Sequence, residues 1–231
     1  VEKLKAKHTI IATGARARSI GNIKFDEEKI LSSTGAMTLK KIPSKMTIVG
    51  SGAIGVEFAY FYNAFGTEVT IIEMLPNILP IEDKDISDVV TREFKKSGIK
   101  LLTETKTESV EIKGGKVITK VSGKINEDIV SEVVLLAIGV QGNVENIGLE
   151  NLGIELERGH IKVDKDYKTN VEGFYAIGDV IGQPWLAHVA SSEGINCIEK
   201  IKGMHVPDIN YLNIPGCTYC QPQVASVGLT E

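Results

Sequence analysis

Residues 45–73, KMTIVGSGAIGVEFAYFYNAFGTEVTIIE, decide the fold, because their pattern is that of one βαβ unit. An apolar strand, KMTIVG, leads into a glycine-rich turn, and an apolar helix is predicted over about residues 53–65. Gly66 ends that helix, and EVTIIE follows as a second strand. Two strands joined by a crossover helix predict an α/β fold of the Rossmann type.

The glycines of VGSGAIGVE carry the strongest functional signal. Gly50, Gly52 and Gly55 have the G-x-G-x-x-G spacing between a strand and a helix. The first glycine allows a tight turn, the second lets a pyrophosphate approach the backbone, and the third lets helix pack on strand. The phosphates would lie at the helix N-terminus. A glycine turn without a ligand is the alternative, and the strand, helix and nearby acid disfavour it.

Glu73 is the acid that this motif requires at the end of the second strand, about 20 residues after the first glycine. A carboxylate there accepts hydrogen bonds from a ribose diol and repels a 2′-phosphate, so the sequence favours NAD over NADP. Glu57, on the first turn of the predicted helix, is open to two interpretations. It is either a solvated or capping carboxylate or a contact to the cofactor.

The rest of the chain alternates helices and strands. A helix is predicted over about residues 85–97, and a glycine turn at Gly114 and Gly115 joins two alternating strands. Three short apolar runs, HTIIATGA, EVVLLAIGV and GFYAIGDV, each contain a glycine at or near the strand end and read as buried strands. A last helix is predicted over residues 185–201. One nucleotide-fold unit at about residues 20–143 is therefore flanked by pieces of another.

Composition excludes several classes of function. Lys and Arg total 26 against 30 Asp and Glu, so no basic field is present to collect nucleic acid or anionic lipid. The longest apolar stretch, residues 133–140, is under half of the roughly 20 residues that a membrane span requires. Three cysteines and no signal-like leader favour the cytoplasm. Neither a nucleophile elbow nor a Walker loop occurs, and we expect the sequence to be part of a longer protein.

Weaker candidates stand outside the glycine motif. Asp179 follows a strand and Gly178, where a carboxylate could bind a sugar-like chain, although a turn is the simpler interpretation. His188 begins the last predicted helix and is otherwise a packed or capping histidine. Cys217 and Cys220 form CTYC, but no second pair stands at metal spacing and the setting is not that of a redox dithiol. Cys197 is predicted to be a small buried apolar residue.

Seven segments together resemble one family, the flavin-dependent pyridine nucleotide-disulfide oxidoreductases. They are IIATGARAR, KMTIVGSGAIGVEFA, VTIIEM, LLAIGVQGNVENIGLE, TNVEGFYAIGDV, LAHVASSEG and IPGCTYCQPQVASVGLTE. Within the family, the last two look most like the branch that oxidises dihydrolipoamide. The resemblance implies FAD and NAD as cofactors, lipoyl domains of 2-oxo acid dehydrogenase complexes as partners, and a homodimeric full-length form.

The resemblance also implies an NAD-binding domain, residues 20–143, inserted in a partial FAD-binding domain, residues 1–19 and 144–208. Residues 209–231 would open a dimerisation domain. The residues implied to hold NAD are Gly50, Ser51, Gly52, Ala53, Ile54, Gly55, Val56, Glu57, Glu73, Thr107 and Gly139. Those implied to lie at FAD are Thr13, Gly14, Ala15, Asp179, Trp185, Leu186, Ala187 and His188.

No catalytic or metal-binding residue is assigned. The redox disulfide of the Cys-x4-Cys kind and the His-Glu acid/base pair of the family do not map onto this sequence. Two alternatives to the lipoamide branch remain open. One is another flavoprotein of the family, such as an NADH oxidase or a mercuric reductase, and the other is an NAD-binding module that does not itself catalyse.

Overall fold

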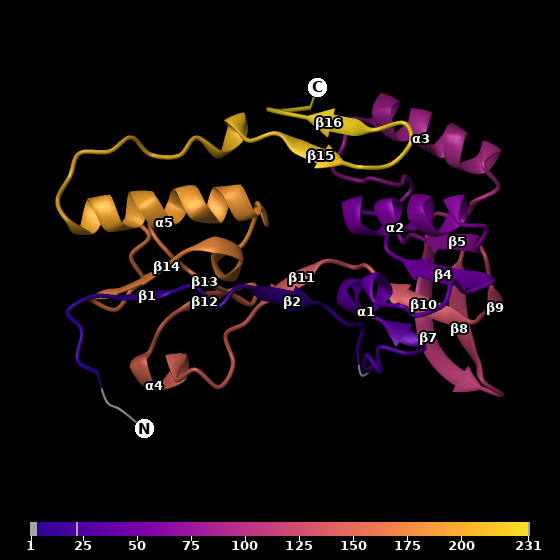
Figure 1. The fold of residues 1–231 in the computed structure, drawn as a ribbon, viewed down its shortest axis with the longest axis horizontal. Helices are drawn as coiled ribbons and strands as arrows, with labels where there is room; N and C mark the ends of the chain where they lie inside the picture. The colour runs from indigo at the N-terminus through magenta and orange to yellow at the C-terminus, as the bar shows by residue number, and fades with distance from the viewer. Residues whose placement is uncertain (1–3, 22, 231) are drawn as a thin grey trace. The chain divides into compact units, whose positions relative to one another are not determined.

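The computed structural model describes residues 4–21 and 23–230, which form two compact units (Figure 1). Unit 1 contains the residues up to Arg16 together with Val140–Tyr211. Unit 2 contains Ala17–Gly139 and the residues from Leu212 onward. The unit boundaries thus lie at 16/17, 139/140 and 211/212, beside the predicted domain boundaries at 19/20, 143/144 and 208/209. The assignment of these units to NAD and FAD stays a prediction.

Unit 2 is built around a five-stranded parallel sheet with the order β3-β10-β4-β5-β6. The strands are β3 (Ile30–Leu31), β4 (Lys45–Val49), β5 (Glu68–Ile72), β6 (Lys100–Leu102) and β10 (Val133–Leu136). Its helices are α1 (Ser33–Met37), α2 (Ala53–Ala64) and α3 (Lys84–Lys96). The predicted βαβ unit is confirmed as β4-α2-β5, and the predicted α/β class is confirmed with it.

Both faces of this sheet are buried, because neighbouring residues of each strand enter different cores. Ile48 and Ile71 pack with the helices, whereas Val49 and Ile72 pack with a second, antiparallel sheet. That sheet consists of β7 (Thr105–Lys113), β8 (Lys116–Gly123) and β9 (Glu127–Ser131). The predicted hairpin is β7-β8, and β9 adds a third strand. An antiparallel layer therefore covers the face that a helix layer covers in a fully doubly wound fold.

The last described residues of the chain belong to unit 2. They form an antiparallel pair, β15 (Gly216–Thr218) and β16 (Val224–Ser226). Cys220 and Val224 are buried in the core that contains α2 and α3. The prediction that residues 209–231 open a dimerisation domain concerns a longer chain and stays a prediction.

Unit 1 is assembled from segments that are far apart in the sequence. β1 (Thr9–Ile11) pairs in parallel with β14 (Phe174–Ala176), and β2 (Ala15–Ala17) pairs with β11 (Val140–Gly142). The remaining elements are α4 (Leu149–Leu152), the β12 (Leu156–Glu157) and β13 (His160–Ile161) hairpin, the 3-10 helix η1 (Gly178–Ile181) and α5 (Ala187–Ile201). A second 3-10 helix, η2 (Tyr211–Asn213), begins at the last residue of unit 1 and continues into unit 2. The predicted strands HTIIATGA and GFYAIGDV are confirmed as β1 and β14.

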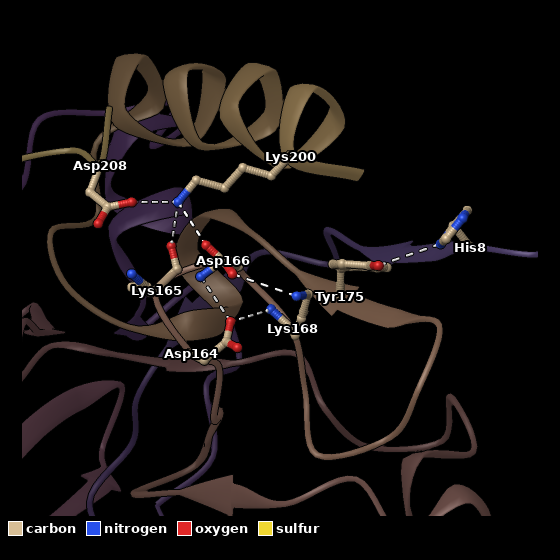
Figure 2. Close-up of polar contacts among 8 residues, drawn as sticks. All are labelled: His8, Asp164, Lys165, Asp166, Lys168, Tyr175, Lys200 and Asp208. Carbon is tan, nitrogen blue, oxygen red and sulfur yellow. Dashed lines mark hydrogen bonds and ion pairs between the residues drawn. The ribbon is translucent and has the colours of Figure 1, made fainter. Parts of the chain in front are cut away.

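Lys200 anchors the C-terminal end of α5 (Figure 2). Its ammonium donates to the Lys165 carbonyl at 2.9 Å, to Asp166 at 3.0 Å and to Asp208 at 2.5 Å. Three segments of unit 1 therefore meet at one nearly buried charge. Among the described residues, no helix combines the length and the apolar character that a membrane crossing requires.

Candidate functional site

The turn after β4 is shaped by Gly50, which has φ +99°. Its N–H donates to the carbonyl of Ile72 at 2.9 Å, so the turn is tied to the end of β5. A Cβ on Gly50 would stand 2.4 Å from the carbonyl oxygen of Ala137. Backbone conformation and close approach both therefore require glycine here.

Gly55 and Gly52 differ in what surrounds them. A Cβ on Gly55 would lie 2.1 Å from the carbonyl oxygen of Gly50, so α2 packs directly on the turn. A Cβ on Gly52 would meet nothing within 4 Å. Gly52 is also the N-cap of α2 and offers no side-chain cap, which leaves the first N–H groups of the helix without intrahelical partners. The open space beside Gly52 and these free donors suit a phosphate.

Glu73 follows β5 and is joined to the glycine turn by hydrogen bonds. Its Oε2 accepts from the Ser51 N–H at 2.9 Å and from the Ser51 hydroxyl at 2.7 Å. Its Oε1 accepts from the Leu75 N–H at 2.8 Å. Glu73 is 9% exposed, so it is largely buried at the edge of the turn. The structure thus places the predicted acid beside the predicted phosphate-binding site.

Two more residues implied for NAD, Thr107 and Gly139, lie two residues along the chain from residues that contact Glu73 or Gly50. Thr107 is on β7, which begins where the Thr105 N–H donates to the Glu73 carbonyl, and its buried hydroxyl has no partner among the described residues. Gly139 has φ +102° and follows Ala137, whose carbonyl abuts Gly50. Their contact with NAD stays a prediction.

Glu57 is not a capping carboxylate, whereas its contact with the cofactor stays a prediction. It lies on the second turn of α2, not the first, and its carboxylate accepts the backbone N–H of Tyr219 at 2.8 Å. It therefore fastens the end of β15 to α2 and does not cap the helix. No sequence pattern signals this contact, because Tyr219 is far away along the chain.

The two cysteines of CTYC stand in opposite environments. Cys217 is exposed on β15, whereas Cys220 is buried, and none of the three cysteines is paired. Burial, with a smaller contribution from Glu57, raises the pKa of the Cys220 thiol to about 11, so this thiol stays protonated. Cys197 is fully buried, as predicted. Among the described residues, no cluster of His, Cys, Asp and Glu is arranged for a metal ion.

In unit 1, Thr13 and Gly14 form a turn against Asn143. The Thr13 hydroxyl donates to the Asn143 carbonyl at 2.7 Å, and the Asn143 amide donates to the Thr13 carbonyl at 2.9 Å. The Asn143 N–H donates to the Gly14 carbonyl at 2.9 Å, just before Ala15 begins β2. The sequence did not identify Asn143 as the partner that fixes this turn.

Asp179 lies in η1, directly after β14. Its side chain is half-buried, and its carboxylate has no hydrogen bond or ion pair within the described part of the chain. The preceding Gly178 N–H donates to Glu193 at 2.7 Å, and the Tyr211 hydroxyl donates to the other oxygen of Glu193 at 2.8 Å. Burial, followed by that hydrogen bond, raises the pKa of the Tyr211 hydroxyl well above its usual range. Glu193, one of two acids in α5, was missed in the sequence.

The four residues before and within α5 separate into two pairs. Ala187 and His188 are exposed in its first turn, whereas Trp185 and Leu186 precede the helix, which corrects its predicted start at residue 185. The Trp185 ring stacks on His160 with 6.0 Å between centroids. The Trp185 Nε1 and the His160 Nε2 are both buried without a partner in the described chain. Such orphaned polar atoms fit a site completed by a polar ligand.

Comparisons with known proteins agree with one another. The sequence profile of the family described as pyridine nucleotide-disulphide oxidoreductase matches residues 1–194. A dihydrolipoyl dehydrogenase of Zymomonas mobilis is 49% identical over 99% of this chain and 50% of its own length. That of Rhizobium etli is 46% identical over 98% of this chain and 48% of its own.

Two solved structures also resemble the chain. LpdA from Mycobacterium tuberculosis has a TM-score of 0.89 and 31% identity, covering 97% of this chain and 49% of that one. The HOCl-induced flavoprotein disulfide reductase RclA from Escherichia coli has a TM-score of 0.85 and 27% identity, covering 96% and 51%. This chain thus spans about half the length of the curated relatives it matches.

Proposed function

The chain belongs to the pyridine nucleotide-disulphide oxidoreductase family, and we propose that it is the central part of an NAD-linked dihydrolipoyl dehydrogenase. FAD, when bound in such an enzyme, would supply the redox chemistry that couples oxidation of a dithiol to reduction of NAD. The chain's own residues supply a binding site for NAD and part of a binding site for FAD. The identities of 46–49% to dihydrolipoyl dehydrogenases support this branch over the NADH oxidase and mercuric reductase alternatives.

The observation that carries the NAD proposal is the pair of hydrogen bonds from Ser51 of the glycine turn to Glu73. The first N–H groups of α2, beside open Gly52, would hold the pyrophosphate, because they are donors at the positive end of the helix dipole. The fixed carboxylate of Glu73 would accept a ribose hydroxyl and repel a 2′-phosphate. Thr107 and Gly139 would lie at the edge of this NAD-binding site.

The FAD proposal is supported by unit 1. Asp179 has a carboxylate without a partner in the described chain, and Trp185 and His160 have buried nitrogen atoms without one. These groups suit the hydroxyl and carbonyl groups of a flavin chain and ring. Thr13, Gly14, Ala15 and Leu186 would border the same ligand, and Ala187 and His188 in the first turn of α5 would present N–H donors to it.

For the whole protein we infer a cytoplasmic homodimer that reoxidises lipoyl domains of 2-oxo acid dehydrogenase complexes. The parent protein should oxidise dihydrolipoamide with NAD. A purified parent that reduces glutathione disulfide with NADPH would contradict this branch. Size-exclusion chromatography of the same sample tests the dimer.

A second candidate function concerns the 231-residue chain by itself, which we propose to be an NAD-binding module without catalysis. Its cysteines have no Cys-x4-Cys spacing, and the buried Cys220 thiol is held protonated. Titration calorimetry should show NADH binding by a colourless protein, with NADPH binding much weaker. The Glu73→Arg variant should reverse that preference, because an attractive charge replaces a repulsive one. Stoichiometric flavin absorbance in the purified chain would contradict this second candidate.

A further inference from the structure

We infer that Ser51, the residue between the first two glycines of the turn, is a positioning residue that sets the preference for NADH over NADPH. This inference rests on the proposed NAD site. It assigns to Ser51 a role distinct from phosphate binding, which falls to the N–H groups of α2.

The contacts of Ser51 are directed at Glu73 and not at open space. Ser51 is fully buried, and both its N–H and its hydroxyl donate to the same oxygen of Glu73, at 2.9 and 2.7 Å. Its own carbonyl accepts the Leu79 N–H at 2.9 Å. Every polar group of Ser51 is therefore engaged within the protein. A buried serine held at three points cannot turn toward a ligand without breaking these bonds.

The same contacts decide which part of the Glu73 carboxylate is available. A carboxylate offers about four acceptor positions, two on each oxygen. Ser51 occupies two on Oε2, and the Leu75 N–H occupies one on Oε1. One position on Oε1 is left for a ribose hydroxyl. Ser51 thus fixes the carboxylate in one orientation and presents a single acceptor.

A fixed carboxylate discriminates better than a mobile one. A 2′-phosphate brings negative charge to the place of the ribose hydroxyl, and a carboxylate that cannot swing away repels it fully. Loss of the Ser51 hydroxyl removes one of three tethers. Glu73 then gains freedom to turn from a phosphate, and the hydroxyl bond to NADH becomes less favourable because the carboxylate must be ordered on binding.

The test is a double-mutant cycle in the 231-residue chain, with NADH and NADPH as probes in titration calorimetry. We expect Ser51→Ala to weaken NADH binding about 5- to 20-fold, less than the roughly 10- to 150-fold equivalent of a whole hydrogen bond to a charged group, because two tethers of the carboxylate remain. NADPH binding should weaken less or improve, so the NADH/NADPH ratio falls. In a Glu73→Gln background the same Ser51→Ala change should weaken NADH binding less than about 2-fold, because the charged partner is gone.

Ser87→Ala is the matched control. Ser87 is also a buried serine, and its hydroxyl donates to the Leu79 carbonyl at 3.2 Å, so it supports the same loop without touching Glu73. Its NADH affinity should stay within about 2-fold of the wild type, since no tether of the carboxylate is lost. Circular dichroism checks that each variant folds. If Ser51→Ala does not fold, Ser51→Cys keeps the volume with a weaker donor and should lower the same ratio.

The outcomes separate the inference from the function it rests on. A wild-type chain that does not bind NADH would overturn the proposed NAD site. A wild-type chain that binds NADH, with an unchanged or higher NADH/NADPH ratio in Ser51→Ala, would overturn only the role of Ser51. Equal effects of Ser51→Ala in the wild-type and Glu73→Gln backgrounds would do the same, because the serine would then act without the carboxylate.

Discussion

At the scale of single residues, the three glycines of the motif are required for different reasons. Gly50 and Gly55 are required by the fold, because a side chain on either would collide with a backbone oxygen. Gly52 is required by nothing within the described protein, since the space beside it is open and its φ of −68° suits any residue. A glycine without a structural reason points to a ligand that approaches the backbone.

This contrast predicts that stability and binding respond to different glycines. Gly52→Val should change the free energy of unfolding by less than about 1 kcal/mol, because no neighbour is displaced, and should abolish measurable NADH binding. Gly50→Val should lower the free energy of unfolding by several kcal/mol, on the order of an overpacked, strained position. Urea unfolding and NADH titration measure the two quantities. Normal NADH affinity in a folded Gly52→Val variant would contradict the phosphate seat.

The ion pair of Arg16 and Glu145 predicts a pH dependence in unit 1. The guanidinium donates to both carboxylate oxygens, at 2.8 and 2.7 Å, and holds the pKa of Glu145 at about 2. A lowered pKa means that the pair stabilises the fold above the unfolded value of about 4.3 and that this is lost as the pH falls toward 2. Both side chains are about half exposed, so the contribution at pH 7 is below about 1 kcal/mol.

Thermal unfolding of Arg16→Met and wild type from pH 7 to pH 2 measures this dependence. The difference between them should be largest at pH 7 and should shrink below about pH 5. Arg18→Met is the control, because Arg18 forms no ion pair among the described residues. A difference that grows as the pH falls would show that Glu145 is not the partner that matters.

At the scale of elements, periodicity and spacing predicted what is local and missed individual contacts between distant residues. The β4-α2-β5 unit, the β7-β8 hairpin and the place of Glu73 follow from periodicity and spacing. The contacts of Glu57 with Tyr219, Thr13 with Asn143, and Glu193 with Gly178 join residues far apart in the sequence or on separate elements. Periodicity holds no information about such pairs. The start of α5 was missed because Trp185 and Leu186 are apolar and continue the helical pattern beyond the helix.

The hydrogen bonds of Lys200 at the end of α5 predict how its substitution changes stability. Lys200→Met removes three hydrogen bonds, two of them to carboxylates, and should lower the free energy of unfolding by about 1–2 kcal/mol. The matched control is Lys202→Met, the same substitution two residues on, at an exposed lysine without an ion pair in the described chain. Urea unfolding should separate the two variants. Equal stability of both would mean that the cluster of Figure 2 does not hold α5 in place.

At the scale of the whole molecule, each unit has apolar cores of its own. Ile48, Ile71 and Leu135 belong to a core made only of unit 2 residues, and Ile161 and Val180 to one made only of unit 1 residues. The candidate NAD residues all lie in unit 2, whereas those implied for FAD lie in unit 1. A ligand that binds at the glycine turn should therefore stabilise unit 2 directly.

This separation predicts a calorimetric result. Because a ligand stabilises only the state that binds it, NADH at about 100 times its dissociation constant should stabilise unit 2 by about 2.7 kcal/mol. We expect two transitions on heating, with NADH raising the midpoint of one and leaving the other unchanged. The Arg16→Met and Lys200→Met variants should lower only the transition that NADH does not move, since both residues are in unit 1. A single transition that responds to all three changes would show that the two units unfold together.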